Sequence, residues 1–187
     1  DWVLLANYAD PSLIRNNVVM DSARVLDKIP FVPTMCSADL YLNDEYAGVY
    51  CLCEQIEFKS GRIEAAENDS ADTSFLLEIG GVDKGKGYVK GTDYFTTKHT
   101  NSILLQEPRA ASAEQFAFIE DYVLQAEGAL YSGEGWTDYI DVESFVDWFI
   151  ATELFYNLDG AGNRSFYILK EAGGKLKAAT IWDFDLA

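Results

Sequence analysis

Oxygen-bearing side chains gather in two short stretches near the end of the 187-residue chain. The first stretch reads N-L-D-G-A-G-N and contains Asp159 and Asn163, and the second reads W-D-F-D and contains Asp183 and Asp185. Carboxylate and carboxamide oxygens are the hard ligands that Mg²⁺ binds, together with water and substrate phosphates. If the two stretches meet in space, they can form a site for a divalent metal ion.

An apolar hairpin is expected between these two stretches. Residues 166–169 (F-Y-I-L) predict one strand, residues 171–174 (E-A-G-G) the turn, and residues 176–182 the return strand. Because a hairpin brings its two ends together, the two acidic stretches are expected to lie side by side.

The order of these residues fits the needs of phosphoryl transfer. That reaction uses an Asp to orient or deprotonate the attacking hydroxyl, and an Asp with an Asn to hold metal ions on the phosphates. Asp159 is the candidate catalytic base and Asp183 the main metal ligand; Asp185 is a second ligand or supports the first, and Asn163 assists the metal. The sequence has no H-R-D, D-F-G or glycine-rich-loop signature of ordinary protein kinases. Alternatively, Asp159 and Asn163 simply stabilise a turn, for which both residue types are favoured.

Three separated stretches of the sequence resemble the spore coat protein H (CotH) kinase family. They are D-W-V-L-L-A-N-Y-A-D-P-S-L-I-R-N at the start, Y-L-N-D-E-Y-A-G-V-Y-C-L-C-E-Q-I in the middle, and N-L-D…S-F-Y…W-D-F-D-L-A at the end. The resemblance implies an atypical protein kinase that is secreted, bound to the cell surface or part of the spore coat. It also implies the use of ATP and Mg²⁺ or Mn²⁺ to phosphorylate Ser or Thr hydroxyls of proteins.

The same resemblance implies that Glu54 and Arg15 lie near the nucleotide. Without it, Glu54 is an ordinary glutamate at the end of a strand, and Arg15 is a solvated arginine or the partner of a core carboxylate. Glu78, at a position where relatives carry either Glu or Lys, leaves the identity of a phosphate-binding lysine open.

The formal net charge of the chain is -17. A field of this sign repels phosphate backbones, so nucleic acid is not expected as a partner. It also repels ATP, so a kinase with this composition needs metal ions and local basic groups at its nucleotide site. No apolar run approaches the roughly 18–20 residues that cross a bilayer, so no membrane span is expected. A second interpretation is that the chain has the same fold but no catalytic activity, and that it is an acidic module that binds Ca²⁺ or a partner protein.

The length suits one α+β domain over residues 1–187, with antiparallel sheets and hairpins packed with helices. The family resemblance implies that this domain has an atypical protein-kinase-like core. The abrupt start and end predict a core excised from a longer domain. Asp10 is the expected N-cap of a helix that runs to about Asp27, and Ser112 with Gln115 forms a capping box for a second helix. A third helix is expected from an Asp141 N-cap, with an apolar face aimed at the following hairpin: Val142, Phe145, Val146, Phe149, Ile150 and Leu154.

Expected strands cover 38–43 and 48–56, joined by an Asn43–Asp44 turn, and also 75–79, 93–98 and 102–106. The glycine-rich stretch 80–91 is interpreted as a hairpin loop, because no G-K-[ST] follows it. The three cysteines leave two possibilities open: buried free thiols, or a disulfide from Cys36 to Cys51 or Cys53.

Overall fold

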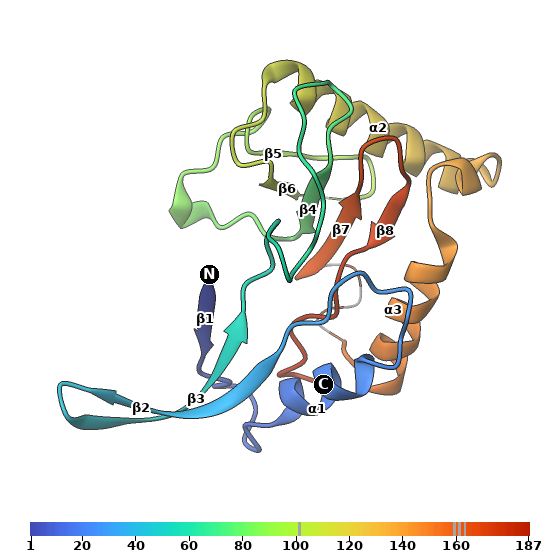
Figure 1. The fold of residues 1–187 in the computed structure, drawn as a ribbon. Helices are drawn as coiled ribbons and strands as arrows, with labels where there is room; N and C mark the ends of the chain where they lie inside the picture. Colours follow the sequence, from blue (N-terminus) through green and yellow to red (C-terminus); the bar gives the residue numbers. More distant parts are fainter. Residues whose placement is uncertain (101, 159, 161, 163) are drawn as a thin grey trace.

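The computed structural model describes residues 1–100, 102–158, 160, 162 and 164–187 (Figure 1). Within this part of the chain, two antiparallel sheets combine with three α-helices. One sheet has the strand order β1-β3-β2 and the other the order β5-β6-β4-β7-β8. The α+β class with antiparallel sheets is therefore confirmed, while the kinase-like arrangement of the core stays a prediction.

The strands of the smaller sheet are β1 (Trp2–Leu5), β2 (Met35–Leu42) and β3 (Glu45–Glu54). Those of the larger sheet are β4 (Phe75–Ile79), β5 (Tyr94–Phe95), β6 (Ile103–Glu107), β7 (Phe166–Lys170) and β8 (Leu176–Ala178). The helices are α1 (Arg15–Ala23), α2 (Ala113–Ser132) and α3 (Val142–Leu154), with short 3₁₀ turns η1 (Lys84–Lys86) and η2 (Trp136–Asp138). Figure 1 shows α2 and α3 flanking the larger sheet and α1 beside the C-terminus, while the β2–β3 hairpin projects away.

The β2–β3 hairpin forms as expected around Asn43 and Asp44. Both residues have positive φ, 51° and 67°, which a two-residue type I′ turn requires and which Asn and Asp tolerate. A register shift between Leu40 and Tyr41 places Cys36 opposite Leu52. The expected alignment of Cys36 with Cys51 or Cys53 is therefore wrong. All three thiols are free, Cys36 exposed and the other two buried.

The first helix is shorter than expected. It starts at Arg15 rather than after Asp10, and it ends at Ala23. The Asp10 carboxylate instead folds the preceding turn, accepting hydrogen bonds from the Ser12 amide and from the Arg15 amide, each at 2.8 Å. Asp10 thus satisfies the first free N–H of the helix from a position outside it.

The second and third helices begin where the sequence predicts. Ser112 and Gln115 make both bonds of the capping box, and the Asp141 side chain caps α3 by accepting from the Ser144 amide. The predicted buried face of α3 is only partly right, because Phe145 packs against Phe166 of β7 whereas Val146 and Phe149 are 48% and 56% exposed.

The face of α3 that packs inward combines small residues with Phe145 and Trp148, whose rings contact Phe166. Ala151 is 1% exposed, and the buried Ser144 hydroxyl accepts a hydrogen bond from the Ala178 amide at 3.1 Å. Small side chains allow α3 to approach β8 closely, which a search for large apolar residues cannot detect.

The larger sheet contributes to all three hydrophobic clusters of the core. One cluster joins it to α1 and α3 through Val19, Met20, Ala151, Phe166, Ile181 and Phe184, and a second joins it to α2 through Phe75, Leu77, Phe116 and Ile119. A third cluster contains Phe31, Ile56, Ile63, Leu76, Tyr167, Leu169 and Ala179. Among the described residues, no helix is long and apolar enough to cross a membrane.

Several loops and strand ends differ from the expected ones. The return strand of the C-terminal hairpin stops at Ala178, and the expected strand 93–98 shrinks to Tyr94–Phe95. The stretch 80–91 is not a hairpin loop, because β5 pairs with β6 and not with β4. The turn after β7 is confirmed, with Gly173 at φ 70° and the Gly174 amide donating to the Glu171 carbonyl.

Candidate active site

Asp183 is tied to the loop after α3 by two hydrogen bonds. The Asn157 side-chain amide donates to the Asp183 main-chain carbonyl at 2.9 Å, and the Ser165 hydroxyl donates to the Asp183 carboxylate at 2.8 Å. Asn157 is buried, and its side-chain oxygen accepts from the Gly160 amide at 3.0 Å. Asn157 and Ser165, which flank the segment containing Asp159 and Asn163, are therefore both bonded to Asp183.

The backbone at this junction is held in an uncommon conformation. Asp183 has φ 64° and Ser165 has φ 50°, both in the left-handed region that residues other than glycine rarely adopt. Such a geometry persists only where the surroundings fix it. Here the hydrogen bonds from Asn157 and Ser165 supply part of that constraint.

Helix α1 holds the same segment from another direction. The buried Asn16 side-chain oxygen accepts a hydrogen bond from the Phe184 amide at 2.8 Å. The Arg15 guanidinium donates to the Asp185 carbonyl at 3.1 Å and lies 3.5 Å from the Asp10 carboxylate. Burial opposes ionisation of Asp10, but hydrogen bonds from Ser12 and Arg15 outweigh it and lower the pKa of Asp10. Arg15 therefore joins a core carboxylate to the W-D-F-D segment.

A second carboxylate, Glu78, lies within electrostatic range of Asp183. Glu78 is on β4, directly across from Tyr167 on β7, and both Tyr167 and Gln106 hydrogen-bond to it. Burial raises the pKa of Glu78, and the charge of Asp183 adds to the increase, while the two hydrogen bonds and Lys86 oppose it. Burial and the charge of Glu78 likewise raise the pKa of Tyr167.

The tight fit around Glu78 explains a glycine in the following turn. A methyl group at Gly81 would lie 2.4 Å from a carboxylate oxygen of Glu78, which is far inside van der Waals contact. A larger residue at this position would require the Glu78 side chain to shift. The Glu78 side chain is therefore partly buried between Gln106 of β6, Tyr167 of β7 and its own loop.

The structure brings some of the predicted site residues together. Asp183 and Asp185 lie in the same segment, and Arg15 contacts that segment through its hydrogen bond to the Asp185 carbonyl. Asp159 and Asn163 lie outside the described residues. Glu54 ends β3, and its carboxylate accepts a hydrogen bond from the Thr34 amide at 2.8 Å, which connects two parts of the smaller sheet.

The described residues do not by themselves make a complete metal centre. Among them, no group of three or more His, Cys, Asp or Glu side chains could hold a metal ion. Mg²⁺ nevertheless commonly uses only one or two carboxylates and completes its shell with water and phosphates. The hard oxygen donors of Asp183 and the neighbouring Ser165 fit that chemistry.

Sequence reasoning missed four contributors to this site: Ser165, Asn16, Gln106 and Tyr167. Tyr167 carried a weak signal, since a tyrosine within a short buried strand needs a polar partner for its hydroxyl. The other three are recognisable only once the strands and α1 are placed, because their partners are 18 to 168 residues away in the sequence.

Comparison with known proteins agrees with the sequence resemblance. No curated protein matches the chain. A family model described as CotH kinase protein matches residues 1–187, which is the whole chain. The protein therefore belongs to the CotH kinase family.

Proposed function

We propose that this chain is a metal-dependent protein kinase core that transfers the γ-phosphoryl group of ATP to Ser or Thr hydroxyls of proteins. The family supports a kinase-like function. The observation that carries the proposal is the junction at Asp183, whose backbone and carboxylate are both bonded to the loop that bears Asp159. Two acidic segments held in this way form the kind of site that phosphoryl transfer requires.

In the proposed reaction, the Asp159 carboxylate orients the substrate hydroxyl and accepts its proton. A bond forms between the hydroxyl oxygen and the γ-phosphorus, the bond from that phosphorus to the β–γ bridging oxygen breaks, and ADP leaves. Asp183 would hold Mg²⁺ or Mn²⁺, with Asp185 as a second ligand or a support for Asp183 and with Asn163 assisting. A divalent ion, when bound, neutralises charge on the phosphates.

Arg15 and Glu54 have proposed roles on the nucleotide side. Arg15 acts by holding the Asp185 backbone, as its hydrogen bond indicates. Glu54 keeps its proposed place near the nucleotide on the family resemblance alone. We further propose an extracytoplasmic location, either secreted or at a cell surface or spore coat, as the family name suggests.

Transfer of label from [γ-³²P]ATP to a protein substrate tests this proposal, with Mn²⁺ or Mg²⁺ present. Asp183→Asn is compared with Asp44→Asn, because both aspartates have positive φ (64° and 67°) and asparagine tolerates that conformation. We expect Asp183→Asn to abolish the labelling of protein and Asp44→Asn to leave it unchanged. Label released only as free phosphate would indicate hydrolysis and contradict the kinase proposal. Equal labelling by wild type and Asp183→Asn would contradict the role of Asp183.

A further inference from the structure

A hollow of about 380 Å³ lies where the end of α2, the turn η2 and the first half of α3 meet. All of the side chains that line it are apolar, among them those of Leu130, Trp136, Val142, Phe145, Val146 and Phe149. Val142, Val146 and Phe149 follow one another at spacings of four and three residues, so they share one face of α3. They are 41%, 48% and 56% exposed, so this apolar face is open to solvent.

The exposed apolar surface continues along α3 beyond the hollow. Ile150 and Leu154, on the same side of the helix, are 46% and 71% exposed. Trp148, which also lines the hollow, packs against Phe166 of β7 with ring centroids 4.3 Å apart. A continuous exposed apolar surface of this kind is typical of a binding site, whereas single exposed apolar residues are ordinary.

The surroundings of the hollow are acidic. Residues 113–154, from the start of α2 to the end of α3, contain ten Asp and Glu but no Lys, Arg or His. The last turns of both helices therefore lack a basic residue, and the negative ends of their dipoles add to the charge. Two lysines from elsewhere offset part of it: Lys28 lies 3.5 Å from Glu143, and the Lys175 ammonium donates to the Thr137 carbonyl.

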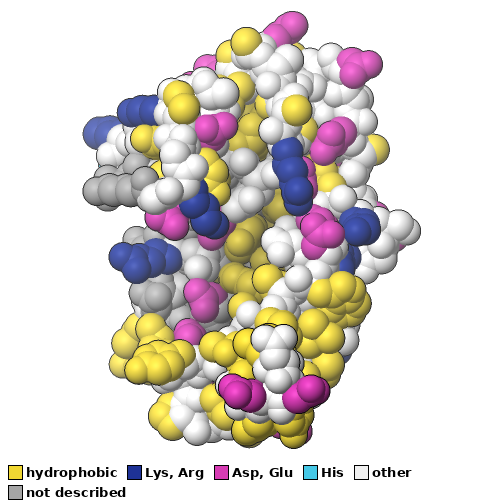
Figure 2. Space-filling view, turned by 90° about the vertical axis from the view of Figure 1, so that its left-hand side faces the viewer, with side chains coloured by type: hydrophobic (Ala, Val, Ile, Leu, Met, Phe, Trp, Pro, Cys, Tyr) yellow, Lys and Arg dark blue, Asp and Glu magenta, His cyan; other side chains and the backbone are white. Residues whose placement is uncertain are grey.

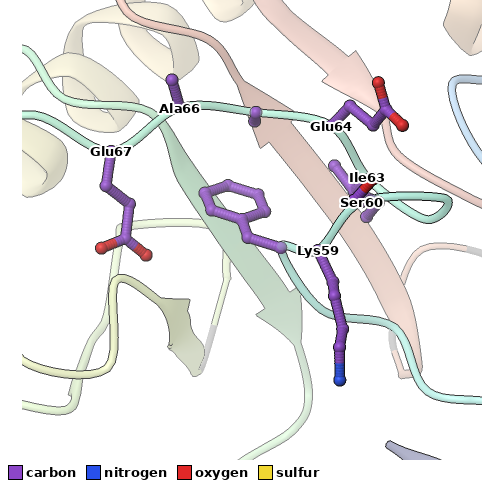
Figure 3. Close-up of a pocket in the computed structure, with 8 residues that line it drawn as sticks. Lys59, Ser60, Ile63, Glu64, Ala66 and Glu67 are labelled. Carbon is purple, nitrogen blue, oxygen red and sulfur yellow. The ribbon is translucent and has the colours of Figure 1, made fainter.

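Charges are mixed on other parts of the molecule. Figure 2 presents the left-hand side of Figure 1, where Lys and Arg side chains lie among Asp and Glu, whereas α3 is on the right-hand side of Figure 1. A hollow of about 490 Å³ between β3 and β4 is also mixed, since Lys59, Glu64 and Glu67 are among the residues that line it (Figure 3). An apolar floor with acidic surroundings distinguishes the hollow beside α3 from these two surfaces.

We propose that the hollow beside α3 is a docking site for a basic amphipathic helix of another protein. A helix binds such a groove through apolar side chains one and two turns apart, which matches the spacing of Val142, Val146 and Phe149. Lys and Arg on the flanks of that helix pair with the surrounding carboxylates. A second copy of this chain would bring the same acidic surface to the contact, and an anionic membrane is repelled in the same way. The docking site does not depend on phosphoryl transfer.

Fluorescence anisotropy with three labelled peptides tests the chemistry of the partner. The first is a helical Leu/Lys peptide with Leu on one face, the second has Glu in place of Lys, and the third is the first in scrambled order. We expect the wild-type protein to bind the first peptide at least about tenfold more tightly than either other peptide, because docking needs both an apolar face and positive charge. Equal binding of the scrambled peptide would show attraction by net charge alone, and equal binding of the Leu/Glu peptide would show that charge has no part; either result overturns the proposal.

The location of the site is tested with Val146→Lys, which places a cation in the hollow. It should weaken binding of the Leu/Lys peptide at least about tenfold. Val18→Lys is the matched control and should leave the affinity unchanged, because Val18 is also 48% exposed and helical but lies on α1. Phe149→Gln removes an apolar contact without adding charge and should weaken binding severalfold. If the three variants keep the wild-type circular dichroism spectrum and bind the peptide equally, the hollow is not the docking site.

Two further measurements distinguish the other occupants. Sedimentation velocity of the protein alone and flotation with phosphatidylserine vesicles are compared for wild type and Val146→Lys. We expect the variant to match the wild type in both. A wild-type dimer that Val146→Lys dissociates would assign the hollow to a second copy of the chain, and vesicle binding that it abolishes would assign the hollow to a lipid surface. Either result would overturn the proposal of a basic helix.

Discussion

The Asn157 side-chain amide lies 2.9 Å from the main-chain carbonyl of Asp183, 26 residues further along the chain. This hydrogen bond connects the end of α3 to the segment after β8. Both residues belong to the candidate active site, and Asn157 is only 3% exposed. The bond therefore couples the stability of the C-terminal hairpin to the position of the proposed metal ligand.

Removing the Asn157 side chain should destabilise the protein and the site together. Asn157→Ala leaves the Asp183 carbonyl and the Gly160 amide without their partner. The cost of such buried, unsatisfied groups is about 1–3 kcal/mol of unfolding free energy. Urea denaturation measures it. Asn157→Asp keeps the acceptor for Gly160 but puts a buried carboxylate against the Asp183 carbonyl oxygen, so it should lose at least as much stability as Asn157→Ala; a smaller loss than in Asn157→Ala would contradict this account.

Lys170 and Asp72 form an ion pair whose two members should respond differently to removal. Lys170 is 1% exposed, its ammonium lies 2.5 Å from Asp72, and the rings of Phe118 and Tyr122 surround it at 5.4 and 4.8 Å. The Asp72 side chain is 38% exposed. Asp72→Ala leaves a buried cation without its partner, a change that costs about 3–5 kcal/mol.

Lys170→Met leaves only a partly exposed carboxylate and fills the aromatic surroundings with an apolar chain. We therefore expect Asp72→Ala to lower the free energy of unfolding by more than Lys170→Met does, as measured in urea. The opposite order would show that the aromatic rings, rather than Asp72, stabilise the Lys170 ammonium.

Glu78 should make the stability of the protein fall as the pH rises. Its pKa is raised in the folded state, chiefly by burial, above the ordinary value of 4.5. The folded protein then binds more protons than the unfolded chain once the pH exceeds that value, so stability falls from about pH 4.5 up to the raised pKa. Glu78→Gln has no such group. We expect the slope of unfolding free energy against pH, measured by denaturation from pH 4 to 8, to be less negative for this variant than for the wild type. Identical slopes would contradict the raised pKa of Glu78.

The three thiols should differ sharply in reactivity. Cys36 is exposed, while Cys51 and Cys53 are buried. Burial raises the pKa of both, that of Cys53 to about 12, so their thiolate fractions at pH 8 are small. Ellman's reagent should therefore modify one thiol per native chain quickly and all three in guanidinium. Modification of only one thiol after unfolding would indicate a disulfide and contradict the free thiols.

The features that sequence reasoning predicted well depend on local chemistry. The Asn43–Asp44 turn, the Ser112 capping box and the Asp141 cap each involve hydrogen bonds or dihedral angles within four residues. Such features need no knowledge of the rest of the fold. The two acidic stretches were expected to meet for a similar reason, since one hairpin joins them, and the bonds from Asn157 and Ser165 confirm that their flanks meet.

The predictions that failed depended on tertiary packing. The inward face of α3 is set by how closely Ser144 and Ala151 approach β8, so Val146 and Phe149 remain exposed although Phe145 of the same predicted face packs inward. The shift between Leu40 and Tyr41 changed the partner of Cys36, and no residue type marks it. The contacts of Glu78 with Gln106 and Tyr167 require β6 and β7 to flank β4, an order that strand propensities do not specify.

The central claim is that the loop after α3 and the W-D-F-D segment bind one divalent cation with ATP. The most direct test is the affinity for Mn²⁺ in the presence of ATP, measured by electron paramagnetic resonance for wild type, Asp159→Asn, Asp183→Asn and the control Asp44→Asn. We expect both site variants to weaken Mn²⁺ binding at least tenfold and the control to match the wild type. Wild-type affinity in Asp183→Asn and Asp159→Asn would contradict the claim.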